Sequence, residues 1–137
     1  MKEDLESKIE KDPYKSEGER RIAQFLKEAQ IPFIYEKETL IKDQGKLKIW
    51  YPDFTMTEYQ IIIEYYGING NPDYSDAVRY KQRAYKENNL DAIPIYPEHL
   101  KNDYRDHIAR SIKQALYKRI NNFENTLNKL KGSYKIE

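Results

Sequence analysis

Three consecutive isoleucines at positions 61–63 constrain the fold more than any other feature of the sequence. Side chains of a β-strand alternate between its two faces, so a short continuous apolar run predicts a strand that is covered on both faces. Glu58 and Tyr59 mark a turn just before this run. The sequence therefore predicts that residues 61–63 form the centre of a sheet.

Other periodic patterns predict the elements around this strand. Ser16 and Glu19 have the spacing of a helix capping box, and an apolar face follows at Ile22, Phe25 and Leu26, which predicts a helix over about 17–29. Further strands are expected at 33–41, 46–54 and 92–96, with a turn at 43–45. A second helix is expected at 74–88 with these side chains facing inward: Ala77, Val78 and Tyr85.

The last segment predicts a long amphipathic helix over about 102–131, because apolar residues recur there every three or four positions. Gly132 is placed like a C-cap. A break near Asn121-Asn122 would make it two helices. Such a helix packs on its own domain or forms a homodimer through the C-terminal helix. The order of elements predicts one α/β domain over 1–137, with a mixed four-stranded sheet, a core at about 16–97 and a C-terminal helical extension.

Composition excludes several classes of site. The chain has no Cys and two His, which excludes disulfides, thiolate nucleophiles, Cys-ligated zinc and His-rich metal cages. A metal must then be held by carboxylates and carbonyls, which favours Mg²⁺ or Mn²⁺. No apolar run is long enough for a membrane span, and the first residues are charged rather than signal-like, so we expect a cytoplasmic protein without a membrane partner.

Net charge is +1, but residues 101–137 carry nine basic and four acidic residues. A basic end on a nearly neutral chain indicates either a polyanionic partner or a solvated helix face. Cations available for phosphate contact, each of them also readable as a plain surface residue, are Lys46, Lys48, Arg79, Arg83, Arg110, Lys113, Lys118 and Arg119.

Two acids stand where the pattern predicts burial. Asp53 ends the strand at 46–54, on an otherwise apolar face formed by Leu47, Ile49 and Tyr51, and Glu64 follows the three isoleucines. An ionised carboxylate in such surroundings costs several kcal/mol unless it is paired, hydrogen-bonded or bound to metal. If the strands at 46–54 and 59–66 form an antiparallel hairpin, Asp53 and Glu64 face each other. Two close carboxylates raise each other's pKa and attract a divalent ion.

Two further acids are weaker candidates. Glu19 lies near the inward face of the first helix, where it either joins the site or acts only as the capping-box partner of Ser16. Glu36 lies on the first strand, and an acid there either joins the site or reaches solvent.

These acids carry a resemblance to a known family. A resemblance to the PD-(D/E)xK nuclease superfamily is carried by the segments Ser16-Glu17-Gly18-Glu19, Tyr35-Glu36, Tyr51-Pro52-Asp53-Phe54 and Ile62-Ile63-Glu64-Tyr65-Tyr66-Gly67. The small members related to very-short-patch-repair endonucleases and to helicase-associated nuclease domains are the most similar. The resemblance covers about residues 16–97.

The resemblance implies a restriction-endonuclease-like fold and a Mg²⁺-dependent endonuclease that hydrolyses phosphodiester bonds in structured or damaged DNA. Asp53 would be the central metal ligand, Glu64 the second, Glu19 the acid from the first helix, and the carbonyl of Tyr65 a further ligand. One or two Mg²⁺ ions, for which Mn²⁺ substitutes, would polarise the phosphate and activate water.

The sequence departs from the family pattern at Tyr66, which stands where the motif lysine is usual. In several subfamilies this lysine comes from the following helix, and Lys81 is positioned for that role if the helix packs over the sheet edge. Otherwise Lys81 is a solvated lysine, and Arg79 and Lys86 are weaker substitutes. The alternative function is a lapsed nuclease-like fold that binds nucleic acid or a protein partner.

Overall fold

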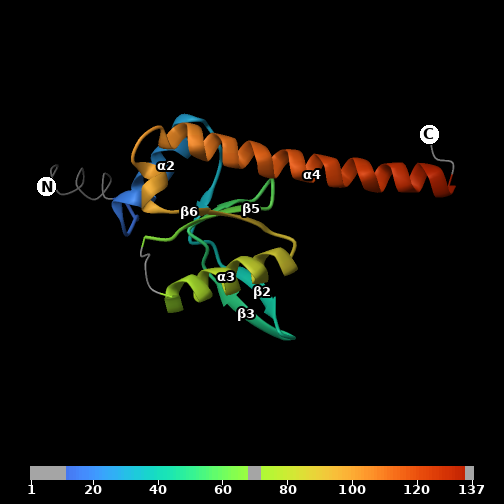
Figure 1. The fold of residues 1–137 in the computed structure, drawn as a ribbon, viewed down its shortest axis with the longest axis horizontal. Helices are drawn as coiled ribbons and strands as arrows, with labels where there is room; N and C mark the ends of the chain where they lie inside the picture. The colour runs from blue at the N-terminus through green and yellow to red at the C-terminus, as the bar shows by residue number, and fades with distance from the viewer. Residues whose placement is uncertain (1–11, 68–71, 135–137) are drawn as a thin grey trace, which may run out of the picture.

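The computed structural model describes residues 12–67 and 72–134 of the chain. It is a mixed α/β fold with a four-stranded sheet, a separate two-stranded sheet, and helices that cover the larger sheet (Figure 1). The elements are α2 (Glu17–Glu28), β1 (Ile34–Tyr35), β2 (Thr39–Asp43), β3 (Lys46–Trp50), β4 (Phe54–Met56), β5 (Ile61–Tyr65), α3 (Pro72–Glu87), β6 (Asp91–Ile95), the 3₁₀ turn η1 (Pro97–Leu100) and α4 (Tyr104–Tyr134).

The predicted central strand is confirmed. The large sheet has the order β1-β4-β5-β6, with β5 antiparallel to β4 and parallel to β6. Ile61, Ile62 and Ile63 are completely buried. Phe54 pairs with Ile63, which confirms the predicted register between the two strands that flank the turn.

The three isoleucines divide the core into two layers. Ile61 and Ile63 belong to the larger apolar cluster, which includes residues of α2 and the first turns of α4. Ile62 points the other way, into a smaller cluster with Ile41 of β2 and Tyr85 of α3. The sheet is thus covered by α2 and α4 on one face and by α3 and the β2–β3 hairpin on the other (Figure 1).

Two predicted strands are wrong in their extent. The strand expected at 33–41 is divided into β1 and β2, because Glu36 adopts a left-handed conformation with φ 50° that no regular strand contains. The strand expected at 46–54 ends at Trp50, and β4 begins at Phe54. Pro52 lies between them, and proline cannot donate to a ladder. The chain passes there from the small sheet to the large one.

The hairpin turn predicted at 43–45 is confirmed. Gln44 and Gly45 both have positive φ, as a two-residue type I′ hairpin turn requires. Its outer face carries Leu40, Leu47 and Ile49, whose exposed fractions are 64%, 68% and 56%. The apolar face predicted for the strand at 46–54 therefore points to solvent.

The helices follow the prediction with three differences. In α3, Val78 and Tyr85 are buried as expected, but Ala77 is exposed. The last helix, α4, is continuous through Asn121 and Asn122, and it also passes through Gly132, which is not its C-cap. No helix in the described part of the chain combines the length and apolar character needed to cross a membrane.

Candidate active site

Asp53 lies in the chain segment that connects the small sheet to the large one, one residue before β4. Its Oδ2 accepts a hydrogen bond of 2.7 Å from the backbone N–H of Tyr65 on the adjacent strand β5. Burial, followed by the negative charge of Glu64, raises the pKa of the Asp53 carboxyl to about 7. Glu19 raises this pKa further, whereas the Tyr65 N–H and the Lys81 ammonium lower it. Both other predicted acids therefore raise the pKa of the Asp53 carboxyl.

Glu64 is 3% exposed, and both of its carboxylate oxygens have partners from α3. Lys81 donates from Nζ to Oε2 at 3.1 Å, and the hydroxyl of Tyr85 donates to Oε1 at 2.8 Å. Lys81 and Tyr85 are four residues apart, which places both side chains on one face of the helix. These two contacts compensate the cost of burying the carboxylate. Lys81 thus lies beside the predicted acid, as the sequence required of a replacement lysine.

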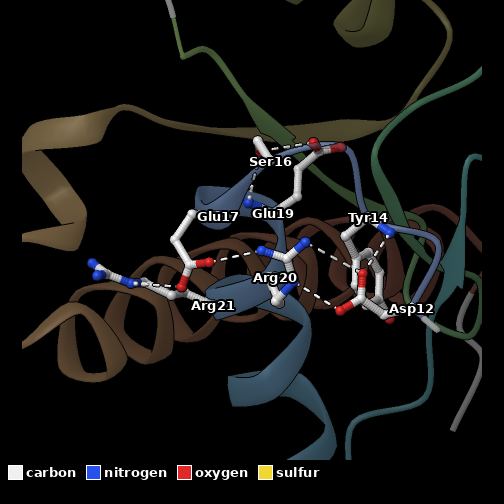
Figure 2. A network of polar contacts seen from close by, with 7 residues as sticks. All are labelled: Asp12, Tyr14, Ser16, Glu17, Glu19, Arg20 and Arg21. Atoms are coloured by element: carbon white, nitrogen blue, oxygen red, sulfur yellow. Dashed lines mark hydrogen bonds and ion pairs between the residues drawn. The ribbon is translucent and has the colours of Figure 1, made fainter. Parts of the chain in front are cut away.

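Glu19 takes part in the helix cap, and it also lines a cavity that contains Asp53. The backbone N–H of Glu19 donates to Ser16 Oγ at 3.1 Å, which confirms the helix cap. Its carboxylate is buried, and it accepts hydrogen bonds from Ser16 Oγ at 2.8 Å and from the Tyr35 hydroxyl at 2.7 Å. Figure 2 shows this carboxylate beside Ser16 at the first turn of α2, apart from the Arg20 guanidinium. Arg20 instead binds Asp12 and Glu17.

Close packing of α2 on β5 holds Glu19 in place. Gly18 lies against the ring of Tyr65, so that a Cβ atom added at Gly18 would lie 2.3 Å from the ring carbon Cζ. Only glycine permits this approach. The consequence is that the backbone of the first turn of α2 lies directly over the strand that carries Glu64.

Two neighbouring cavities meet at Asp53. One, of about 280 Å³, is lined by residues that include Asp53, Tyr65, Glu64 and Lys81. The other, of about 540 Å³, is lined by Asp53 and Tyr65 together with Lys15, Glu19, Glu36 and Tyr51. Asp53 and Tyr65 are shared by both. The candidate site is therefore an elongated depression with Asp53 at its middle.

The three predicted acids do not form one compact cluster. Within residues 12–67 and 72–134, no group of three or more His, Cys, Asp or Glu side chains lies close enough to hold a metal ion. The alternation of β5 explains this, because Tyr65 packs against Gly18 of α2 whereas Glu64 points to α3. Glu19 and Glu64 thus reach Asp53 from opposite faces of the sheet.

The residues present nevertheless have the chemistry of a hard-cation site. Asp53 and Glu64 offer carboxylate oxygens, which Mg²⁺ and Mn²⁺ prefer. Burial, followed by the charge of Glu64, raises the pKa of Asp53, so the protein's own cations do not fully compensate its negative charge when it ionises. A divalent ion next to Asp53 would supply that compensation.

Tyr66, at the usual position of the motif lysine, is part of the core. Its side chain is 5% exposed, and its hydroxyl donates to Gln82 Oε1 at 3.1 Å. The ring also packs against Tyr74 and Tyr96. Tyr66 therefore supplies no positive charge to the site.

Sequence reasoning missed three residues of the site. Lys15 forms an ion pair of 2.8 Å with Glu36 at the rim of the larger cavity, and Tyr35 and Tyr85 donate to Glu19 and Glu64. Tyr85 was expected to face inward, but periodicity alone cannot assign a buried hydroxyl to one acid. No pattern in the sequence singles out Lys15 among the neighbouring charges.

Most of the cations considered for phosphate contact have acidic partners. Arg79 pairs with Asp76, Arg110 with Asp106 and Lys48 with Asp43. Arg119 is 14% exposed at its side chain and binds Asp91, and it also donates to the carbonyls of Gln60 and Asn89. Its role is thus to attach α4 to the sheet.

Comparison with known proteins bears on the fold. No protein-family model matches the sequence, and no curated protein is similar to it. Among solved structures, the catalytic domain of the homing endonuclease I-Bth0305I is similar, with a TM-score of 0.54 and 16% sequence identity. The similarity covers 72% of this chain and 95% of that domain. The chain shares a nuclease-like fold with it.

Proposed function

We propose that the protein is a metal-dependent endonuclease that hydrolyses phosphodiester bonds in DNA. The observation that carries this proposal is the arrangement of Asp53, Glu64 and Lys81, which lie together on a fold shared with an endonuclease catalytic domain. Fold likeness by itself does not specify an activity. The site chemistry, a buried acid pair beside an ammonium group, supplies the specific support.

Asp53 and Glu64 would hold Mg²⁺ or Mn²⁺, and the Tyr65 carbonyl is a further candidate ligand. A bound divalent ion supplies Lewis acidity toward a phosphate oxygen and lowers the pKa of bound water. Glu19 adds negative charge from the other side of Asp53. The Lys81 ammonium, held by Glu64, lies where it can stabilise charge that develops on a phosphate in the transition state.

Nuclease assays with matched variants test the proposal. Branched, nicked and linear DNA are incubated with the protein and Mg²⁺ or Mn²⁺. We expect cleavage by the wild type and its loss in Asp53→Asn and Glu64→Gln. Asp43→Asn is the control, because Asp43 is an acid as buried as Glu64 and pairs with Lys48 away from the two cavities that contain Asp53. Equal cleavage by all four proteins would remove both acids from the mechanism.

A lapsed nuclease that binds nucleic acid without cleaving it is the second candidate. Two observations favour it: Tyr66 replaces the motif lysine, and both oxygens of Glu64 already have protein partners. Thermal denaturation with increasing Mn²⁺ separates the two candidates. A working site gains stability as RT ln(1 + [L]/Kd), and Asp53→Asn removes that gain. A lapsed site gives no such gain but still binds DNA in a salt-dependent way.

A further inference from the structure

The second half of α4 presents an apolar seam that the rest of the molecule leaves uncovered. The seam consists of Ile120, Phe123, Leu127, Leu130 and Tyr134, with exposed fractions of 47%, 69%, 47%, 42% and 72%. Figure 1 shows that this half of the helix extends past the globular body. An isolated helical segment of this length is marginal in water, so its stability requires a covering partner.

The spacing of the seam indicates what kind of surface covers it. Starting from the partly buried Leu116, the apolar residues follow at steps of four, three, four, three and four. This is the 3.5-residue period of a coiled coil, in which the a and d positions face another helix. A flat protein surface or a DNA groove imposes no such period.

Charge argues against nucleic acid as the partner. Only three of residues 120–134 are charged, namely Glu124, Lys129 and Lys131. The other basic residues of α4 lie before the seam. A helix with a net charge of +1 over four turns offers little to a phosphate backbone, whose binding depends on many cations.

We propose that the seam binds the same seam of a second copy of this chain, as an antiparallel two-helix coiled coil. In that arrangement Leu116 packs against Tyr134 of the second copy, Ile120 against its Leu130 and Phe123 against its Leu127. Every layer of the coil is then apolar. This inference is independent of the proposed nuclease activity.

Steric reasons favour the antiparallel direction. At about 100° per residue, the seam lies roughly 60° around the helix from the side chains that pack on the body, such as Ile108 and Ile112. A parallel partner would bring its own body to the same end of the pair as the first body, so that both bodies crowd one end of the coil. An antiparallel partner places the two bodies at opposite ends of the coil.

The antiparallel arrangement also fills an existing groove. Next to Leu116 lies an apolar depression of about 460 Å³ between α2 and α4, lined by residues that include Phe25, Ile31 and Ile112. The end of the partner helix, with Tyr134, arrives at this level. The seam thus continues into a receiving surface at its body end.

Sedimentation velocity over roughly 1–200 μM protein tests the proposal. We expect the mass to rise with concentration from the 16.5 kDa of the chain to twice that value. Replacing Phe123 and Leu127 by Asn should weaken association about 100-fold, because two large apolar side chains per copy are lost. Leu40→Asn with Leu47→Asn is the control: it removes two equally exposed apolar side chains on the hairpin and should leave the dimer intact.

Orientation has its own test, since the chain contains no Cys. Glu124→Cys should form a disulfide-linked dimer under mild oxidation, because residues 124 flank each other in the antiparallel coil and lie on opposite sides of a parallel one. Asn121→Cys, on the outer face, should not. A wild type that stays monomeric at 200 μM, or a hairpin variant that also dissociates, overturns the dimer. A dimer that forms no cross-link at 124 overturns its direction.

Discussion

Asp53 is the residue at which the site's electrostatics are concentrated. Its carboxyl is largely buried next to Glu64, and its pKa is raised to about 7 from an ordinary value near 3.8. Without a metal, the folded state therefore retains a proton that the unfolded state releases. Asp53 must then lower the stability of the metal-free protein as pH rises between about 4 and 7.

Asp53→Asn should accordingly stabilise the metal-free protein at pH 8. Asparagine can still accept the Tyr65 N–H but cannot ionise. After allowance for solvent screening, the gain should be about 2 kcal/mol at pH 8 and near zero at pH 4. Urea denaturation in EDTA at the two pH values measures it. A variant that is no more stable at pH 8 contradicts the assigned burial of this charge.

Gly18→Ala should destabilise the protein, although alanine normally favours a helix by 0.5 to about 1 kcal/mol over glycine. The added methyl group would overlap the Tyr65 ring, and the cost should be about 2 kcal/mol. The double variant Gly18→Ala with Tyr65→Ala provides the check. Once the ring is gone, the alanine at 18 should no longer destabilise, whereas a persistent cost would point to the backbone instead.

Lys81→Met should reduce DNA cleavage about 10²-fold to 10³-fold, the size typical of removing one group that stabilises transition-state charge. DNA affinity should change little, because Lys81 would be only one of several cations that contact phosphates. Single-turnover cleavage and fluorescence anisotropy measure the two quantities separately. Lys86→Met, on the same helix, is the matched control. A parallel loss of binding and cleavage would make Lys81 a binding residue.

The sequence indicated Asp53 and Glu64 because acids stood out against apolar patterns, and it indicated Lys81 through the family resemblance, as a replacement for the lysine missing at Tyr66. It could not indicate Lys15 or Tyr35, whose partners are 21 and 16 residues away and follow no period. It also could not show that Glu19 and Glu64 approach Asp53 from opposite faces. That depends on how the Tyr65 ring packs, which is a tertiary contact.

At the level of elements, patterns with several turns or with full burial were predictable, and short strands were not. Helix α2 and strand β5 agree with prediction because capping and the isoleucine run act locally. The separation of β2 and β3 from the large sheet was not expected. This separation depends on the left-handed Glu36 and on Pro52, and single residues of this kind interrupt a strand without changing its alternating pattern.

Arg119 joins three elements, and its replacement should be costly. Its guanidinium binds Asp91 and donates to the carbonyls of Gln60 and Asn89, so that it attaches α4 to the start of β5 and of β6. Arg119→Ala should lower the free energy of unfolding by about 1.5–3 kcal/mol, since three acceptors lose a charged donor. Arg110→Ala, which breaks an exposed ion pair on the same helix, should cost less than about 0.5 kcal/mol. Chemical denaturation measures the free energy of unfolding of both variants. Equal losses would contradict the role of Arg119 in attaching α4 to the sheet.

At the scale of the whole molecule, α4 divides into a part that belongs to the core and a part that does not. Ile108 and Ile112 are buried in the larger apolar cluster, whereas every seam residue from Ile120 onward is exposed. The boundary between core and extension thus lies inside one continuous helix. Hydrophobic periodicity predicts the helix but not the residue at which its packing against the core ends.

Truncation should expose this boundary. Removing residues 121–137 should leave the melting temperature at low micromolar concentration within a few degrees of the wild type. Removing residues 101–137 should prevent folding, because it deletes Ile108, Ile112 and the Arg119 contacts. Circular dichroism with thermal melting distinguishes the two. A folded 1–100 fragment would show that α4 is dispensable to the core.

The two parts of α4 also differ in what protects their backbone amides from solvent. Amides near Ile112 are shielded by a core that one chain supplies alone, so their deuterium uptake is independent of how much protein is present. In the proposed dimer, amides near Leu127 would gain shielding only through association, so their uptake should slow as the solution is concentrated. One unbroken helix would therefore contain amides whose deuterium uptake is independent of protein concentration and amides whose uptake reports self-association.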